Sequence, residues 1–191
     1  MNEFDIIRKY FSPLSKKNKG SFNLQNDIFF DFKKKISISV DTYVEKKHFF
    51  DFKSPDLVIS KTFRSALSDL ICKGVTPKYY FVSASGNEKT FTQKKLKLIH
   101  NALKREQKKF NLILVGGDTT KSNVLSFTFV MVGYLDKIPL TRSGAKAFDD
   151  IYVTGSLGES FIGMKILKKK IKFNINEKKY FVNSYYHPNL Q

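Results

Sequence analysis

The segment KISISVDT, residues 35–42, alternates apolar and polar side chains with the period of two that predicts a β-strand. A helix is predicted next, because Ser54-Pro55-Asp56 places proline in a first helical turn and an apolar stripe follows as far as Gly74. The segment YYFVSA, residues 79–84, predicts a second strand. A strand, a helix and a strand in this order indicate the α/β or α+β class.

The flanking segments continue the alternation of helices and strands. Thr92 is a predicted cap for a helix that reaches about Phe110. A short buried strand at 112–115 is predicted to run into the segment GGDTT, residues 116–120. A long strand at 125–135 alternates weakly, which predicts that both of its faces are covered. The remaining predicted elements are helices at 1–11, 159–169 and 177–186 and a strand at 150–154.

Composition limits the class of protein. The 191 residues are 41% hydrophobic, enough for a packed core, which excludes wholesale disorder. The single cysteine, Cys72, excludes an internal disulfide framework and fits a reducing compartment. No apolar run has the length of a membrane span, and the opening MNEFDIIRKYF lacks the apolar stretch of a signal peptide. We therefore expect a soluble, cytoplasmic protein.

The net charge of +17 has two explanations. Thirty of the 34 basic residues are lysines, spread from Lys9 to Lys179. A nucleic-acid-binding protein concentrates its basic residues and uses arginine for bidentate contacts. The composition therefore favours an amino-acid bias of the kind that an A/T-rich genome imposes. A basic, non-enzymatic nucleic-acid-binding module stays open as the alternative.

Five acidic positions lie at or beside predicted elements, and they are Asp27, Asp41, Asp69, Asp118 and the pair Asp149-Asp150. Carboxylates that face one cleft are what Mg²⁺ bound to phosphates requires, whereas each of them alone is explained as a turn or cap residue. Gly116 and Gly117 would also let a backbone approach a phosphate closely. No Gly-Lys-Ser/Thr follows, so the segment is not a Walker loop.

Other chemistries find less support. The three histidines, His48, His100 and His187, lack the spacing of a zinc site. No Gly-x-Ser-x-Gly segment is present. Cys72 lies near an apolar helix end, and nothing marks a partner histidine, so it is interpreted as a packing residue.

Seven segments in order resemble the thiamine-monophosphate kinase family, of the aminoimidazole-ribonucleotide-synthetase-like superfamily. The family's Glu-Phe-x-x-Ile opening is similar to Glu3–Ile7, and its Ile-Gly-Asp-Asp to Leu24–Asp27. Its Ser-Thr-Asp-Thr-Leu-Val-Glu-Gly-Val-His-Phe resembles Ser39–Phe49. Its Asn-Leu-Ser-Asp-Leu-x-x-Met-Gly-x-x-Pro is matched from Ala66-Leu67-Ser68-Asp69-Leu70 through Gly74 to Pro77. The last three are Val115–Thr120, Arg142–Ala145 and Tyr152–Gly158.

The resemblance implies an enzyme that moves the γ-phosphoryl group of ATP onto thiamine monophosphate with the help of Mg²⁺. It implies metal ligands at Asp27, Ser39, Asp41, Asp69 and Asp118. It implies ATP contacts at Gly117, Asp118, Arg142 and His100, and a substrate contact at His48. No general base is implied, because the acceptor is itself an ionised phosphate. A related kinase or synthetase with another small substrate is the nearest alternative.

The resemblance also implies a fold and an assembly. It implies a four-stranded mixed sheet backed by helices over residues 1–137, and the beginning of a truncated second domain over 138–191. Two such sheets would pair in a homodimer. The rest of the family's second domain carries further ATP and metal ligands, so we expect residues 1–191 alone to be catalytically impaired.

The chain departs from the family pattern near the implied site. Gln25-Asn26 replaces Gly-Asp, Val40 replaces threonine, and Lys46-Lys47 replaces Gly-Val. The segment from His187 to Gln191 lacks the arginines that the family tends to place around that proline.

Overall fold

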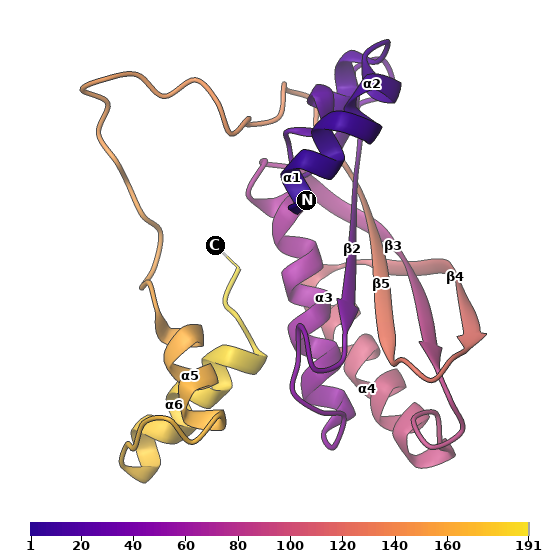
Figure 1. The fold of residues 1–191 in the computed structure, drawn as a ribbon, viewed down its shortest axis with the longest axis vertical. Coiled ribbons are helices and arrows are strands. Elements are labelled where there is room, and N and C mark those ends of the chain that lie inside the picture. The colour runs from indigo at the N-terminus through magenta and orange to yellow at the C-terminus, as the bar shows by residue number, and fades with distance from the viewer. Residues whose placement is uncertain (191) are drawn as a thin grey trace.

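A computed structural model describes residues 1–190 as a five-stranded sheet with helices on one face, and a helical pair joined to it by an extended segment (Figure 1). The strands are β1 (Phe29–Asp31), β2 (Ile36–Val44), β3 (Thr76–Gly86), β4 (Ile113–Lys121) and β5 (Ser126–Tyr134), in the order β1-β2-β5-β3-β4. Only β3 and β4 are parallel. The predicted mixed sheet is confirmed, but it has five strands rather than four, because the short β1 adds to the edge of β2.

The helices follow the sequence signals closely. They are α1 (Glu3–Ile6), a π-helix (Ile7–Phe11), α2 (Ser12–Ser15), a 3₁₀ segment (Lys19–Leu24), α3 (Pro55–Ile71), α4 (Gln93–Phe110), α5 (Glu159–Leu167) and α6 (Ile175–Tyr186). The Thr92 side chain accepts a hydrogen bond from the Lys95 amide and caps α4 as predicted. Asn111 ends α4 in the left-handed conformation.

The core lies between α3 and one face of the sheet. Alternate residues of β5, Phe127, Phe129 and Met131, are buried, and the residues between them are less so. The predicted coverage of both faces of this strand is therefore wrong. Phe63 of α3 packs edge-on against Phe129, with ring centroids 5.7 Å apart. No helix in residues 1–190 packs on the opposite face, which we call the open face.

A buried ion pair holds α3 to α4. Glu106 of α4 is fully buried, and its Oε2 atom lies 2.8 Å from Nε of Arg64 on α3. Because Arg64 is itself only 7% exposed, its charge depends on Glu106 for compensation, whereas Glu106 also lies 3.6 Å from Nε of Arg105.

One predicted element of the C-terminal half differs in the structure. Residues 150–154 form no strand, and Ile151 is 92% exposed because no neighbouring strand in the described chain pairs with it. The helical pair packs on itself instead, since Ile166 of α5 is buried and Gly163 lies against the backbone of Phe181 in α6. The pair reaches the sheet unit through Tyr185, which stacks on Phe50 with ring centroids 5.6 Å apart.

No helix among residues 1–190 combines the length and the apolar character needed to cross a membrane.

Candidate functional site

Three of the predicted aspartates gather where β1, β2 and α3 meet. Asp41 lies on β2 and Asp69 on α3, which packs against β2. Asp27 lies in the bend just before β1, which pairs with β2 through Phe29 and Ile38, so it lies near the same edge of the sheet. We call Asp27, Asp41 and Asp69 the acidic group.

The negative charges of the acidic group repel one another. Burial raises the pKa of Asp69 to about 7, and the negative charges of Asp41 and Asp27 add to the increase. The Tyr43 hydroxyl donates a hydrogen bond of 2.7 Å to Oδ2 of Asp41 and holds that carboxylate in place. Burial, and then the hydrogen bond to Asp41, raise the pKa of Tyr43, so the phenol keeps its proton.

Asp27 is already neutralised by two cations. Nζ of Lys73 lies 2.9 Å from Oδ2 of Asp27, and the Arg142 guanidinium donates to both oxygens of the same carboxylate. Burial alone would raise the pKa of Asp27, but the hydrogen bonds and charges of Lys73 and Arg142 outweigh burial and lower it. Arg142 therefore contacts a predicted metal ligand here.

The donor atoms of this region suit a hard divalent cation. Carboxylate and hydroxyl oxygens are the ligands that Mg²⁺ prefers. Ser39 lies on the same face of β2 as Asp41, and its Oγ atom is buried without a hydrogen-bond partner in the described chain. A buried polar atom of this kind needs a partner, which a cation would supply. Within residues 1–190, no three His, Cys, Asp or Glu side chains already converge as a ready metal site.

Asp118 is separated from the acidic group within a single chain. Across the sheet, Asp41 of β2 pairs with Phe129 of β5, Phe129 pairs with Val82 of β3, and Val82 pairs with Gly117 of β4. Asp118 therefore lies three strands away, about 14 Å at the usual strand spacing. Because successive side chains alternate between faces, Asp118 lies on the open face, opposite to Asp41.

The GGDTT segment is a strand, not a loop, in the structure. It extends β4 to Lys121, and every residue of β4 is exposed. A Cβ atom on Gly117 would come within 1.9 Å of the Val82 carbonyl oxygen, so sheet packing itself requires glycine there. The prediction of a short buried strand at 112–115 is therefore wrong in both length and exposure.

Tyr43, which binds Asp41 through its hydroxyl, also contacts His48 through its ring. The Val44 amide donates a hydrogen bond of 2.9 Å to Nδ1 of His48, which leaves Nε2 as the protonated nitrogen, able to donate outward. The imidazole packs edge-on against the Tyr43 ring, with centroids 5.7 Å apart. A chain of contacts thus runs from His48 through Tyr43 to Asp41.

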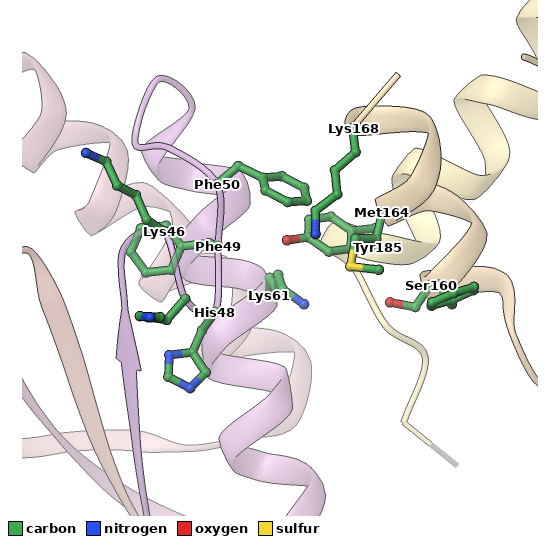
Figure 2. Close-up of a pocket in the computed structure, with 11 residues that line it drawn as sticks. Lys46, His48, Phe49, Phe50, Lys61, Ser160, Met164, Lys168 and Tyr185 are labelled. Atoms are coloured by element: carbon green, nitrogen blue, oxygen red, sulfur yellow. The ribbon is translucent and has the colours of Figure 1, made fainter. Parts of the chain in front are cut away.

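A cationic cavity of about 400 Å³ opens beside His48 (Figure 2). Figure 2 shows Phe50 on one side and Tyr185 and Met164 of the helical pair on the other. The cavity is lined by four lysines and no carboxylate; the lysines are Lys46, Lys47, Lys61 and Lys168. Burial lowers the pKa of Lys61, whose Nζ lies 4.2 Å from the centre of the Tyr185 ring. An anionic group would relieve the repulsion among these ammonium groups.

His100 is exposed on α4, a different helix from the one that carries Asp69. Three groups that shape the site were not predicted from the sequence: Lys73, Tyr43 and Lys61. Lys73 could have been noticed in the sequence, because it lies one residue before Gly74, where the family pattern has methionine. Tyr43 and Lys61 could not, because their roles depend on contacts between separate elements.

The raised pKa of Asp69 predicts that the stability of the protein depends on pH. The unfolded carboxyl ionises near 3.8, whereas the folded one keeps its proton to about 7, so the unfolded state loses its proton first. The free energy of unfolding should therefore fall as the pH rises from about 4 to about 7, and then level off. Urea unfolding in EDTA at pH 5 and pH 8 measures this difference. Asp69→Asn should reduce it, and an identical difference in both proteins would contradict the pKa shift.

Comparison with known proteins gives a family match and both sequence and structural relatives. A model of the family "AIR synthase related protein, N-terminal domain" matches residues 25–135. A thiamine-monophosphate kinase of Buchnera aphidicola subsp. Acyrthosiphon pisum is 38% identical over 192 residues, covering 97% of this chain and 58% of the relative.

Two solved structures share the fold. The thiamine monophosphate kinase of Aquifex aeolicus superposes with a TM-score of 0.77 at 22% identity, over 94% of this chain and 62% of that chain. A structure described as AaThiL complexed with AMPPCP and TMP gives a TM-score of 0.83 at 21% identity, over 100% of this chain and 62% of that chain. The chain thus spans about three fifths of the length of these proteins.

Proposed function

We propose, from the premise that this chain belongs to the AIR synthase related family by its N-terminal domain, that it is part of an ATP-dependent thiamine-monophosphate kinase. The relatives support this activity, because the Buchnera protein named thiamine-monophosphate kinase matches 97% of this chain. The single observation on which the proposal depends is the acidic group with the unpartnered Ser39 hydroxyl beside it.

We propose that Asp41, Asp69 and Ser39 hold Mg²⁺, with Asp27 beside them as the member of the acidic group that Lys73 and Arg142 neutralise. When bound, the metal would neutralise phosphate charge and orient the phosphates, which is most of what phosphoryl transfer requires of a protein. The chain's own residues prepare this site. Tyr43 fixes the orientation of Asp41 through its hydrogen bond, and Arg142, which is exposed, is free to exchange Asp27 for an ATP phosphate.

The acceptor phosphate would lie on the His48 side of the site. Nε2 of His48 can donate a hydrogen bond, and the nearby lysines would stabilise an anion. The half-buried Phe50, which lines the same cavity, offers apolar ring surface to the rest of an acceptor molecule. Gly117 and Asp118 of β4, and His100 of α4, remain proposed ATP contacts, and a cytoplasmic location remains a proposal.

The activity is tested by ADP release, with and without thiamine monophosphate. The chain is measured alone and as a chimera that carries the C-terminal part of the Buchnera relative, since the chain covers 58% of that protein. We expect turnover by the chimera and little by the chain alone. Turnover with another phosphorylated acceptor only would favour a related superfamily kinase. Tight nucleic-acid binding with a steep salt dependence, and no binding of ATP with Mg²⁺, would overturn the kinase proposal.

We also propose that two copies pair through the open face of the sheet. This face exposes apolar side chains in a contiguous sheet: Val40 is 60% exposed, Tyr134 43% and Phe81 39%. An exposed apolar sheet face of this kind is typical of an interaction surface.

Val40→Asp should convert the dimer to a monomer, because a carboxylate would be buried at the centre of the pairing surface. Light scattering after gel filtration measures the mass. Phe148→Asp is the control, since Phe148 is fully exposed outside the sheet and its replacement should leave the dimer intact. A wild-type monomer, or a dimeric Val40→Asp variant, would contradict the pairing.

A further inference from the structure

Lys73 is a buried cation placed against the acidic group. Its side chain is 6% exposed, and Nζ lies 2.9 Å from Oδ2 of Asp27, whose side chain is 15% exposed. The residue lies two positions after the end of α3, where its amide donates to the Leu70 carbonyl, so the backbone fixes its position. Gly74 then turns the chain away in the left-handed conformation.

Both oxygens of Asp27 are occupied by cations. Oδ2 receives Lys73 and Nε of Arg142, the latter at 3.1 Å, and Oδ1 receives the other end of the guanidinium. The two cations differ in burial, since the Arg142 side chain is 62% exposed. Arg142 can leave for solvent or ligand at little cost, whereas Lys73 would remain.

A buried ammonium is costly unless a negative charge compensates it. The structure provides that compensation with the same carboxylates that a divalent cation would use. The positive charges of Lys73 and Arg142 also act on Asp69, where they oppose the repulsion from Asp41 and Asp27. Lys73 therefore supplies part of the charge neutralisation that the acidic group needs in the absence of metal.

We propose that Lys73 is a resident counter-ion of the acidic group, which takes the place of one divalent cation and withdraws Asp27 from direct metal binding. This inference rests on the proposed function only in so far as the group binds divalent cations. Asp41, Asp69 and Ser39 then form the part of the group that is open to metal. Lys73 is a positioning residue, and the metal requirement of this chain is smaller than that of a protein with an apolar residue at this position.

The test counts bound metal. Mn²⁺ is titrated as a stand-in for Mg²⁺ and counted by electron paramagnetic resonance, in the wild-type chain and in Lys73→Met, without nucleotide. We expect Lys73→Met to bind one additional ion per chain, or to bind Mn²⁺ roughly 10-fold more tightly, because a positive charge has left the site. Lys53→Met is the matched control, since Lys53 pairs with Asp51 at 3.7 Å but is 88% exposed. It should bind like the wild type.

A second variant guards against a folding defect. Lys73→Gln keeps a polar side chain and removes only the charge, and it should show the same gain in metal binding. If a Lys73 variant unfolds in EDTA and refolds when Mn²⁺ is added, that result also supports the proposal. An unchanged number and affinity of ions, no binding by any protein, or unfolding of both variants with and without Mn²⁺ would overturn it. No thiamine monophosphate enters the titration, so an inactive chimera would refute the proposed function without changing this result.

Discussion

Asp41→Asn should abolish most of the proposed phosphoryl transfer while it leaves the fold intact. The asparagine keeps an oxygen that can accept the Tyr43 hydrogen bond, so the local structure survives. It loses the charge that would hold Mg²⁺ against the phosphates. We expect kcat/KM of the chimera to fall roughly 100-fold or more, the scale reported for the loss of one group that stabilises developing charge. ATP binding in the presence of Mg²⁺ should weaken in the chain itself.

The thermal midpoint in EDTA separates this loss from a folding defect. Asp41 raises the pKa of Asp69 by repulsion, so its neutralisation should leave the metal-free protein equally or more stable. Asp136→Asn is the control, because Asp136 is exposed and lies outside the site. If Asp41→Asn retained wild-type kcat/KM, the acidic group would not be the metal site of a kinase.

The elements that local sequence signals specify were predicted well. α3 has a proline in its first turn and a continuous apolar stripe, and α4 has the Thr92 cap. Both helices lie where these signals place them. β2 likewise follows its alternation. These signals act within a few residues, so they do not depend on the rest of the chain.

Elements that depend on partners were predicted less well. The segment at 150–154 has the apolar content of a strand but no strand beside it in the described chain. β4 runs beyond Val115 because its glycines let it lie against β3, a contact that a linear pattern does not contain. Alternation on a strand reveals two faces but not which one a helix will cover. This is why the sequence could not separate Asp118 from Asp41.

The candidate site shows the same division. Their places beside predicted elements marked Asp27, Asp41 and Asp69 as candidates, and the resemblance implied that they bind metal together. In the structure, α3 carries Asp69 to the sheet that bears Asp41. The neutralisation of Asp27 by Lys73 joins residues 46 positions apart and could not be derived from spacing. The charge of +17 was interpreted as a compositional bias, yet four lysines of that excess line one cavity beside His48.

The largest stability effect should come from Glu106, away from the site. Glu106 is fully buried and receives Nε and Nη2 of Arg64, at 2.8 and 3.3 Å. Arg64 donates in addition to the Pro188 carbonyl at 3.3 Å, so this pair anchors α3, α4 and the C-terminal segment to one another. Glu106→Gln would preserve the shape and leave the guanidinium buried without a compensating charge.

We expect Glu106→Gln to lower the free energy of unfolding by about 3–5 kcal/mol, the cost of breaking a buried pair from one side. Urea unfolding at pH 7 measures it. Glu88→Gln is the matched control: Glu88 pairs with Lys121 at 2.9 Å, but both side chains are at least 80% exposed, so stability should hardly change. Replacing both partners, with Arg64→Met and Glu106→Leu, should recover much of the loss, because apolar side chains of similar volume need no compensation. A single variant as stable as the control would show that water or another group neutralises Arg64, and that the pair does not join α3 to α4.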